Sequence, residues 1–171
     1  MRKVIYVIGA ALMGTLPVAI AAPMDQSTQD QTFVNEAARG GQMEVNLGQL
    51  AEKKASNPKV KQFGERMVKD HTRLNAELSS VAKSIGLNVP GTLSARQQAE
   101  YEKLAKLSGP AFDTSYMNLM VKDHTGDLAA FRKEETATQN QDLKATITKA
   151  IPVIQEHLDM ARSDSSKLAA R

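Results

Sequence analysis

The chain has 171 residues, of which 22 are basic and 19 acidic, 4% are aromatic and none is cysteine. Without cysteine it cannot form disulfides, iron–sulfur clusters or thiolate zinc sites, so any metal would need His, Asp, Glu or Met ligands. The mixed charges and the few aromatic rings do not form the basic, stacking surface that binds nucleic acid, and we expect no nucleic-acid partner.

Residues 1–21 have the order of a secretory signal peptide. Arg2 and Lys3 precede an uncharged apolar stretch, and Ala19 and Ala21 supply the small residues of a cleavage site. An uncleaved membrane anchor is the alternative, although the stretch is at the short limit for spanning a bilayer. We predict cleavage, a periplasmic or secreted protein, and no integral membrane span once the signal peptide is removed.

Apolar residues recur at helical spacing along almost all of the remaining chain. The mature part has the length of one ordinary domain, which can build a core without covalent staples. We expect residues 22–28 to be disordered and residues 29–171 to form one four-helix bundle. The long helices are predicted at 29–55, 58–85, 110–136 and 142–168, with a short helix at 94–107.

The connection between the second and third long helices predicts the topology. It is long and contains the short helix, whereas the link between the first two helices is a near-minimal turn at Asn57 and Pro58. A long connection of this kind lets a bundle cross over, which leaves the second and third helices parallel, as in ferritin-like folds. The expected fold class is therefore all-α, a ferritin-like four-helix bundle with a crossover that contains a short extra helix.

A six-residue sequence, Met-Val-Lys-Asp-His-Thr, occurs twice, at 67–72 and at 120–125. It places one histidine on the apolar stripe of the second long helix and one on that of the third. The last helix carries a weaker echo, Glu156-His157. On the apolar stripe of the first helix the only charged residue is Glu44.

These polar residues all lie near the midpoints of their helices. Helices of similar length that pack side by side bring their midpoints to one level. One carboxylate and three imidazoles should therefore converge, a sufficient ligand set for one zinc, iron or copper ion. The predicted ligands are Glu44, His71, His124 and His157, with Asp127 as a less favoured candidate.

Each feature of this layer has an alternative explanation. A hydrogen-bonded glutamate–histidine network could satisfy the buried groups without a metal, since an unsatisfied one costs about 1–3 kcal/mol. Methionines one turn from each histidine would suit copper, but methionine is also a pliable core filler. The acids that directly precede the histidines point elsewhere and are expected to contact neighbouring helices or to support the imidazoles. These acids are Asp70, Asp123 and Glu156.

The motifs together resemble the domain of unknown function 4142 family, over residues 33–168. That resemblance implies an exported bacterial protein, sometimes labelled an outer-membrane protein, with a ferritin-like fold in the periplasm. It implies no known reaction. The residues that carry it are Phe33-x3-Ala37-Ala38-x-Gly40-Gly41-x2-Glu44-Val45-x-Leu47-Gly48, Asn57-Pro58-x-Val60-Lys61-x-Phe63-Gly64, the two hexapeptides and Glu156-His157-Leu158.

The chain departs from di-iron ferritins at the positions three residues before its histidines. Those proteins place Glu-x-x-His on two helices, whereas this chain has Val68, Val121 and Ile154 there. We therefore expect no di-iron chemistry, predict no catalytic residue, and lean against an enzyme. The predicted function is binding of one transition metal, in metal or oxidative-stress handling. The alternative is a non-catalytic envelope module that binds another protein and whose histidine layer is structural.

Overall fold

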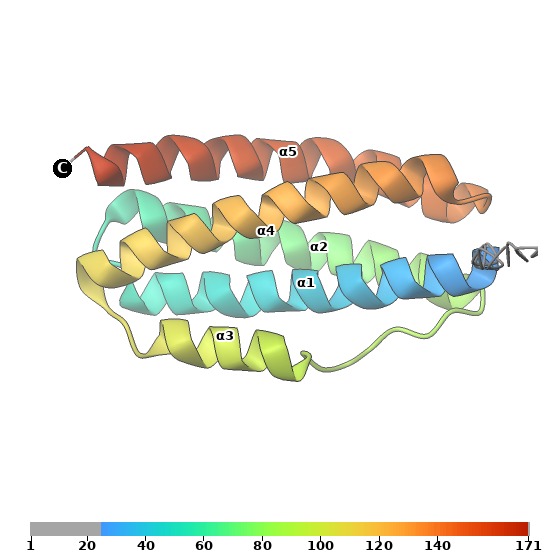
Figure 1. Ribbon diagram of the computed structural model, residues 1–171, viewed down its shortest axis with the longest axis horizontal. Coiled ribbons are helices and arrows are strands. Elements are labelled where there is room, and N and C mark those ends of the chain that lie inside the picture. The colour runs from blue at the N-terminus through green and yellow to red at the C-terminus, as the bar shows by residue number, and fades with distance from the viewer. Residues whose placement is uncertain (1–24, 171) are drawn as a thin grey trace, which may run out of the picture.

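The computed structural model describes residues 25–170, which form five α-helices and, within that range, no strand (Figure 1). Each helix matches a predicted one to within three residues at either end. Among these residues no helix is long and apolar enough to cross a membrane. The helices are α1 (Gln26–Lys54), α2 (Pro58–Ser84), α3 (Ala95–Ala105), α4 (Gly109–Ala137) and α5 (Gln141–Ala169).

The start of α1 differs from the prediction. We expected residues 22–28 to be disordered, but α1 begins at Gln26. The carbonyl of Asp25 accepts hydrogen bonds from the backbone N–H groups of Thr28 and Gln29, at 3.0 and 3.1 Å, which begins the helix one turn earlier. The predicted signal peptide, residues 1–21, lies outside the described part of the chain.

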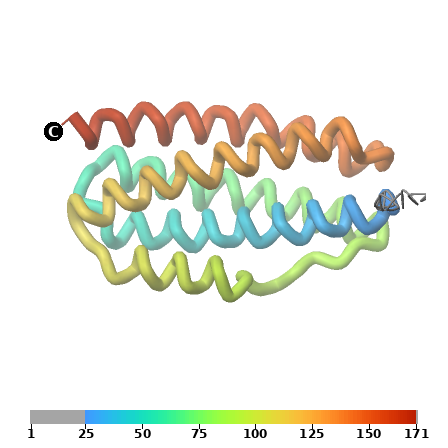
Figure 2. The backbone as a smooth tube through the Cα atoms, in the orientation of Figure 1, coloured from blue at the N-terminus to red at the C-terminus, as the bar shows by residue number. Residues whose placement is uncertain are grey.

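Four of the helices form the bundle, and α3 lies outside it. α1 packs against α2 and α4, and α5 packs against the same two helices, so α2 and α4 occupy opposite corners. The colours in Figure 2 show that α2 and α4 run in the same direction, opposite to α1 and α5. Between them the chain returns along the bundle through α3. This is the direction that the long connection predicts.

Local sequence sets the turn between α1 and α2. Asn57 caps α2 by accepting a hydrogen bond from the N–H of Lys59 at 2.9 Å, and Pro58 occupies the first turn. The buried carboxylate of Asp113, on α4, accepts from the N–H and hydroxyl of Ser56, at 3.0 and 2.6 Å, and from the N–H of Asn57, at 2.9 Å. This carboxylate therefore ties the turn to the start of α4.

The other helix ends follow the same rules of capping. Gly86 has φ of 79°, a left-handed conformation that suits glycine at the end of α2. Ser94 and Gln97 form a capping box at the start of α3. Asn140 caps α5 by accepting from the N–H of Leu143 at 3.0 Å. A glycine thus ends α2, and polar side chains cap the starts of α2, α3 and α5.

Glycines let α1 and α2 approach one another closely. A Cβ atom placed on Gly48 would lie 2.6 Å from the carbonyl oxygen of Gly64, and one placed on Gly64 would lie 2.8 Å from the Cβ of Ala51. Neither position has space for a side chain. The backbones of α1 and α2 are therefore in direct contact at this level.

A second glycine contact lies on the other side of Glu44. A Cβ atom on Gly41 would lie 2.0 Å from the side-chain oxygen of Asn75. Because α1 and α2 run in opposite directions, Glu44 and His71 then meet at the level between these two glycine contacts. The glycines therefore fix the register that brings Glu44 to His71.

We predict that Gly48→Ala destabilises the protein. The added methyl group has no space between the two backbones, and overpacking costs roughly 1–3 kcal/mol in the free energy of unfolding. Gly126→Ala on α4 is the matched control, because no atom lies within 4 Å of the point that its methyl group would occupy; it should stabilise the helix by about 0.5–1 kcal/mol. Urea unfolding followed by circular dichroism measures both. Equal stability of Gly48→Ala and wild type would contradict the close approach.

Candidate metal centre

Three buried imidazoles meet in the middle of the bundle. His71 comes from α2, His124 from α4 and His157 from α5, and one ring nitrogen from each lies within 4.8 Å of the other two. The ring centroids are 5.1 to 5.6 Å apart. The residues are 5%, 0% and 0% exposed. The prediction that the three histidines share one layer is confirmed.

The repeated hexapeptide explains why two of these rings stand level. His71 and His124 occupy the same place in their copies, and the helices that carry them run in the same direction (Figure 2). A fully buried methionine lies one turn before each histidine on the same stripe, Met67 before His71 and Met120 before His124. The apolar stripe therefore turns both imidazoles inward, and α5 brings His157 to them from the third side.

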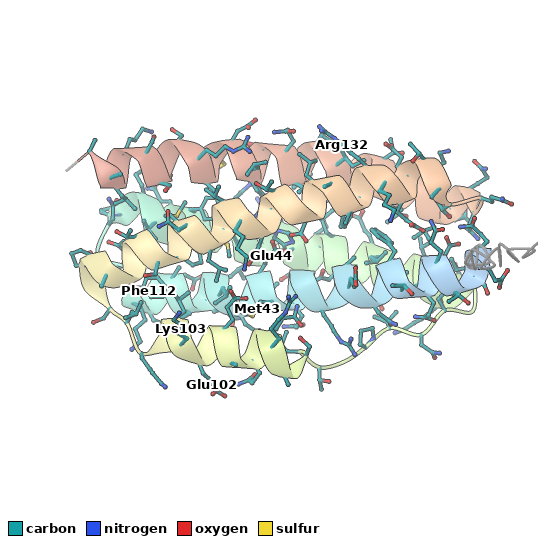
Figure 3. All side chains as sticks on the ribbon, in the orientation of Figure 1. Met43, Glu44, Glu102, Lys103, Phe112 and Arg132 are labelled. Carbon is teal, nitrogen blue, oxygen red and sulfur yellow. The ribbon has the colours of Figure 1, made fainter. Side chains whose placement is uncertain are left out.

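Glu44 contacts two of the three histidines. It is 3% exposed and lies near the middle of the bundle, between α1 and α4 (Figure 3). One oxygen, Oε2, accepts a hydrogen bond from Nδ1 of His71 at 3.0 Å, and the other, Oε1, lies 3.4 Å from Nε2 of His124. Burial alone would raise the pKa of Glu44, but the neighbouring His71 and His124 lower it to about 2. Its carboxylate is therefore ionised, and its role as a ligand stays a prediction.

Hydrogen bonds fix which nitrogen of each ring carries the proton. His71 donates from Nδ1 to the carboxylate of Glu44. His124 donates from Nδ1 to the backbone carbonyl of Met120 at 3.0 Å, and His157 donates from Nε2 to Asp70 at 3.0 Å. These oxygens only accept, so the neutral form of each ring carries its lone pair on the opposite nitrogen.

Those opposite nitrogens are buried and lack a partner. Nε2 of His71, Nε2 of His124 and Nδ1 of His157 have no hydrogen-bond partner among residues 25–170, and neither does Oε1 of Glu44. Burial lowers the pKa of His124, and it lowers that of His157 to about 4. These two rings are therefore neutral at pH 7 and offer their lone pairs to an electron-pair acceptor.

Asp70 supports His157 from the neighbouring helix. Besides the hydrogen bond from His157, its carboxylate accepts one from Arg66, which also pairs with Glu156 at 2.9 Å. Burial would raise the pKa of Asp70, but the hydrogen bonds from Arg66 and His157 lower it. The interpretation of Asp70 and Glu156 as supporting contacts is confirmed. Arg66 was not predicted, although its position four residues before Asp70 is a signal for such a pair.

Asp123, the equivalent of Asp70 in the second hexapeptide, has different surroundings. It hydrogen-bonds none of the three histidines, as far as residues 25–170 show. Burial, the charge of Glu100 on α3 and that of Glu44 raise its pKa to about 6. Identical sequences thus place one aspartate against an imidazole and the other toward α3.

Asp127, the less favoured ligand, lies beside Glu44 rather than among the imidazoles. Burial and the charge of Glu44 raise its pKa well above the usual value, and the two carboxyl groups share a hydrogen bond. Burial beside Glu44 thus favours the protonated form of Asp127, which can donate to Glu44. It is not one of the three residues whose nitrogens converge.

A small cavity adjoins one side of this layer. Its volume is about 30 Å³, enough for one or two water-sized molecules. Glu44, His71 and Asp127 reach it, and most of its remaining wall is apolar. Gly41 and Asn75, which form the second glycine contact, also line it. The cavity therefore lies inside the bundle, lined by residues of α1, α2, α4 and α5, and reaches the histidine layer.

The sequence matches one family model, described as a domain of unknown function (DUF4142), over residues 15–163. The chain belongs to this family. No curated protein and no solved structure matches it. Since the family description names no reaction, the geometry of the histidine site is the basis for assigning a function to this DUF4142 protein.

We predict that His157 makes the free energy of unfolding of the metal-free protein fall as the pH drops below 6.5. The unfolded chain protonates this ring below its usual pKa of 6.5, whereas the folded protein resists protonation until about pH 4. The contribution of neutral His157 is therefore complete above pH 6.5 and falls by about 2 kcal/mol between pH 7 and pH 5.

The variant His157→Gln isolates this effect in urea unfolding of EDTA-treated protein. Glutamine keeps a donor for Asp70 but does not titrate, and the comparison cancels other groups such as Asp127, whose raised pKa acts in the opposite direction. The stability difference between wild type and variant should shrink by about 2 kcal/mol on going to pH 5. Parallel pH profiles would contradict the prediction.

Proposed function

We propose that this DUF4142 protein is an exported, periplasmic bundle of the ferritin-like type that binds one transition-metal ion, for metal or oxidative-stress handling. The observation that carries the proposal is the convergence of three buried imidazoles, each with one nitrogen that no protein group in residues 25–170 satisfies. Export is supported by the charged, apolar and small-residue order of residues 1–21. The ferritin-like assignment is supported by the shared direction of α2 and α4 (Figure 2).

The donor atoms suit a divalent transition metal. In a tetrahedral site with bonds of about 2.0–2.1 Å, neighbouring ligand atoms lie about 3.4 Å apart. Oε1 of Glu44 and Nε2 of His124 are 3.4 Å apart, and neither carries a proton, so their lone pairs repel each other. A cation between them would turn that repulsion into two attractive contacts. We therefore include Glu44 with His71, His124 and His157 as the proposed ligands.

The imidazoles are already held as ligands would be. In metal sites, the nitrogen that does not bind the ion usually donates to a carboxylate or a backbone carbonyl, which fixes the tautomer. His71 donates to Glu44, His124 to the carbonyl of Met120, and His157 to Asp70. The proposed metal-binding nitrogens are therefore the three that bear lone pairs.

The donor set favours one ion over a di-iron centre. Bridging carboxylates would be needed for two iron ions, and Val68, Val121 and Ile154 occupy the corresponding positions. Glu44 is the ionised carboxylate that touches the imidazoles, since Asp70 is engaged with Arg66 and His157 on the far side of the latter ring. Zinc, iron and copper all accept imidazole and carboxylate ligands. We propose no catalytic step.

The alternative is an envelope interaction module whose histidine layer is only a hydrogen-bonded core. One hydrogen bond per ring supports it. Against it, three ring nitrogens and one carboxylate oxygen have no partner among the described residues, at about 1–3 kcal/mol each. A purely structural network would be expected to satisfy its own members. Metal binding accounts for these four atoms together.

We predict that the protein binds one equivalent of Zn(II) or Co(II). Elemental analysis of protein purified from the periplasm without a histidine tag, followed by titration of the EDTA-treated form, measures the stoichiometry. At a free metal concentration of 100 times Kd, binding should stabilise wild type by about 2.7 kcal/mol. His71→Ala should remain helical and lose that stabilisation. If added metal stabilises neither protein and the variant is merely less stable, the layer is structural.

The same substitution in each hexapeptide tests whether Asp70 supports His157 or acts only through its negative charge. Asp70→Asn weakens the acceptor that orients His157 and should lower Zn(II) affinity by roughly 10–100-fold. Asp123→Asn removes the equivalent acid, which hydrogen-bonds no histidine among the described residues, and should leave the affinity unchanged. Competition with a chromogenic zinc chelator measures both. Equal losses in the two variants would refute the role of Asp70.

A further inference from the structure

We propose that copper in its cuprous state binds at this centre through a second, softer set of donors, the thioether sulfurs of Met67, Met120 and Met160. This inference rests on the proposed metal function and goes beyond it, because it names the ion and ligands that the imidazoles alone do not select.

Their sequence positions place the three methionines about one helical turn from the imidazoles. Met67 and Met120 each precede a histidine by four residues, whereas Met160 follows His157 by three. Because α2 and α4 run in one direction and α5 in the other (Figure 2), all three offsets lead toward the same end of the bundle. One helical turn is about 5.4 Å. A sulfur layer therefore adjoins the nitrogen layer on one side only.

These side chains belong to a single buried cluster. Met67 and Met120 are 0% exposed, and Met160 packs against the same cluster. Phe63, in that cluster, also packs edge-on against the ring of His124, with the centroids 6.4 Å apart. The methionines and the imidazoles are thus parts of one continuous interior.

The distribution of methionine along the core argues against simple filling. Every methionine within residues 25–170 lies in or against this cluster, beside the start of α4. The two other apolar clusters contain none and are built from Leu, Ile, Val, Phe and Ala. Both halves of the bundle need close packing, so a pliable filler has no reason to gather in one half.

Ligand chemistry then selects the ion. Soft thioethers favour Cu(I), whereas imidazole binds copper as well as zinc and iron. The chain has no cysteine, so methionine is its only soft donor. A cuprous ion at the boundary between the sulfur and nitrogen layers could take ligands from both, and a zinc ion would use the imidazoles and Glu44 alone.

The test compares two ions on the full mature protein and on leucine variants. Cu(I) affinity is measured anaerobically by competition with bicinchoninate, and Zn(II) affinity by titration of the same samples. The double variant M67L/M120L keeps the core volume, since leucine and methionine are close in size. Its Cu(I) affinity should fall by roughly 10–100-fold or more. Removing a group that only supports a ligand already costs that much, and the proposed sulfurs bind the ion directly. Its Zn(II) affinity should not change.

The control is Met117→Leu. Met117 is fully buried in the same cluster but lies seven residues before His124, two turns from the imidazoles, and the variant should keep wild-type Cu(I) affinity. Unchanged Cu(I) binding in M67L/M120L, or an equal loss in M117L, overturns the inference. If the double variant does not fold, Met160→Leu, at a partly buried position, tests the same point. Binding of neither ion by wild type would instead refute the proposed metal function itself.

Discussion

The buried carboxylate of Glu44 constrains the residues around it, because an ionised group in a protein interior needs hydrogen bonds or an opposite charge. His71 donates to it, Asp127 lies beside it with a raised pKa, and Nε2 of His124 faces it at 3.4 Å. Glycine contacts between α1 and α2 hold it at this level. The apolar stripes alone would let four similar helices slide past one another, whereas these polar groups have partners in one register only. The same charge that demands compensation also makes the centre attractive to a cation.

Much of the fold follows from patterns within single helices. Periodicity predicted the helices, Asn57, Gly86 and Ser94 predicted their ends, and the long connection predicted the shared direction of α2 and α4. The convergence of the histidines could be predicted as well, because it requires only that each residue lie inward and near a midpoint. The protonation pattern could not, since it depends on atoms from other helices. The different contacts of the two hexapeptides also depend on other helices. Asp70 accepts a hydrogen bond from His157, whereas Asp123 lies near the like charge of Glu100, although their local sequences are identical.

The first turn of α1 and the position of Asp127 also depend on contacts that the sequence pattern does not reveal. Gln26 and its neighbours have no apolar periodicity, so the sequence suggested a disordered start, but the backbone of Asp25 begins the helix there. Asp127 shares a face with His124 and therefore resembled a ligand. Burial and the charge of Glu44 instead raise its pKa. In both cases a backbone or interhelical contact that leaves no trace in spacing decides the outcome.

The proposed donors are divided evenly between two helical hairpins. α1 and α2 supply Glu44 and His71, and α4 and α5 supply His124 and His157, while α3 in the connection supplies none. Neither hairpin supplies enough ligands alone, so a bound metal would link the two hairpins. Disulfides join distant parts of many chains, but this cysteine-free sequence cannot form them. Under the proposed metal function, a bound ion would give the same restraint in a reversible form, and the joining of the two hairpins would then depend on the supply of metal.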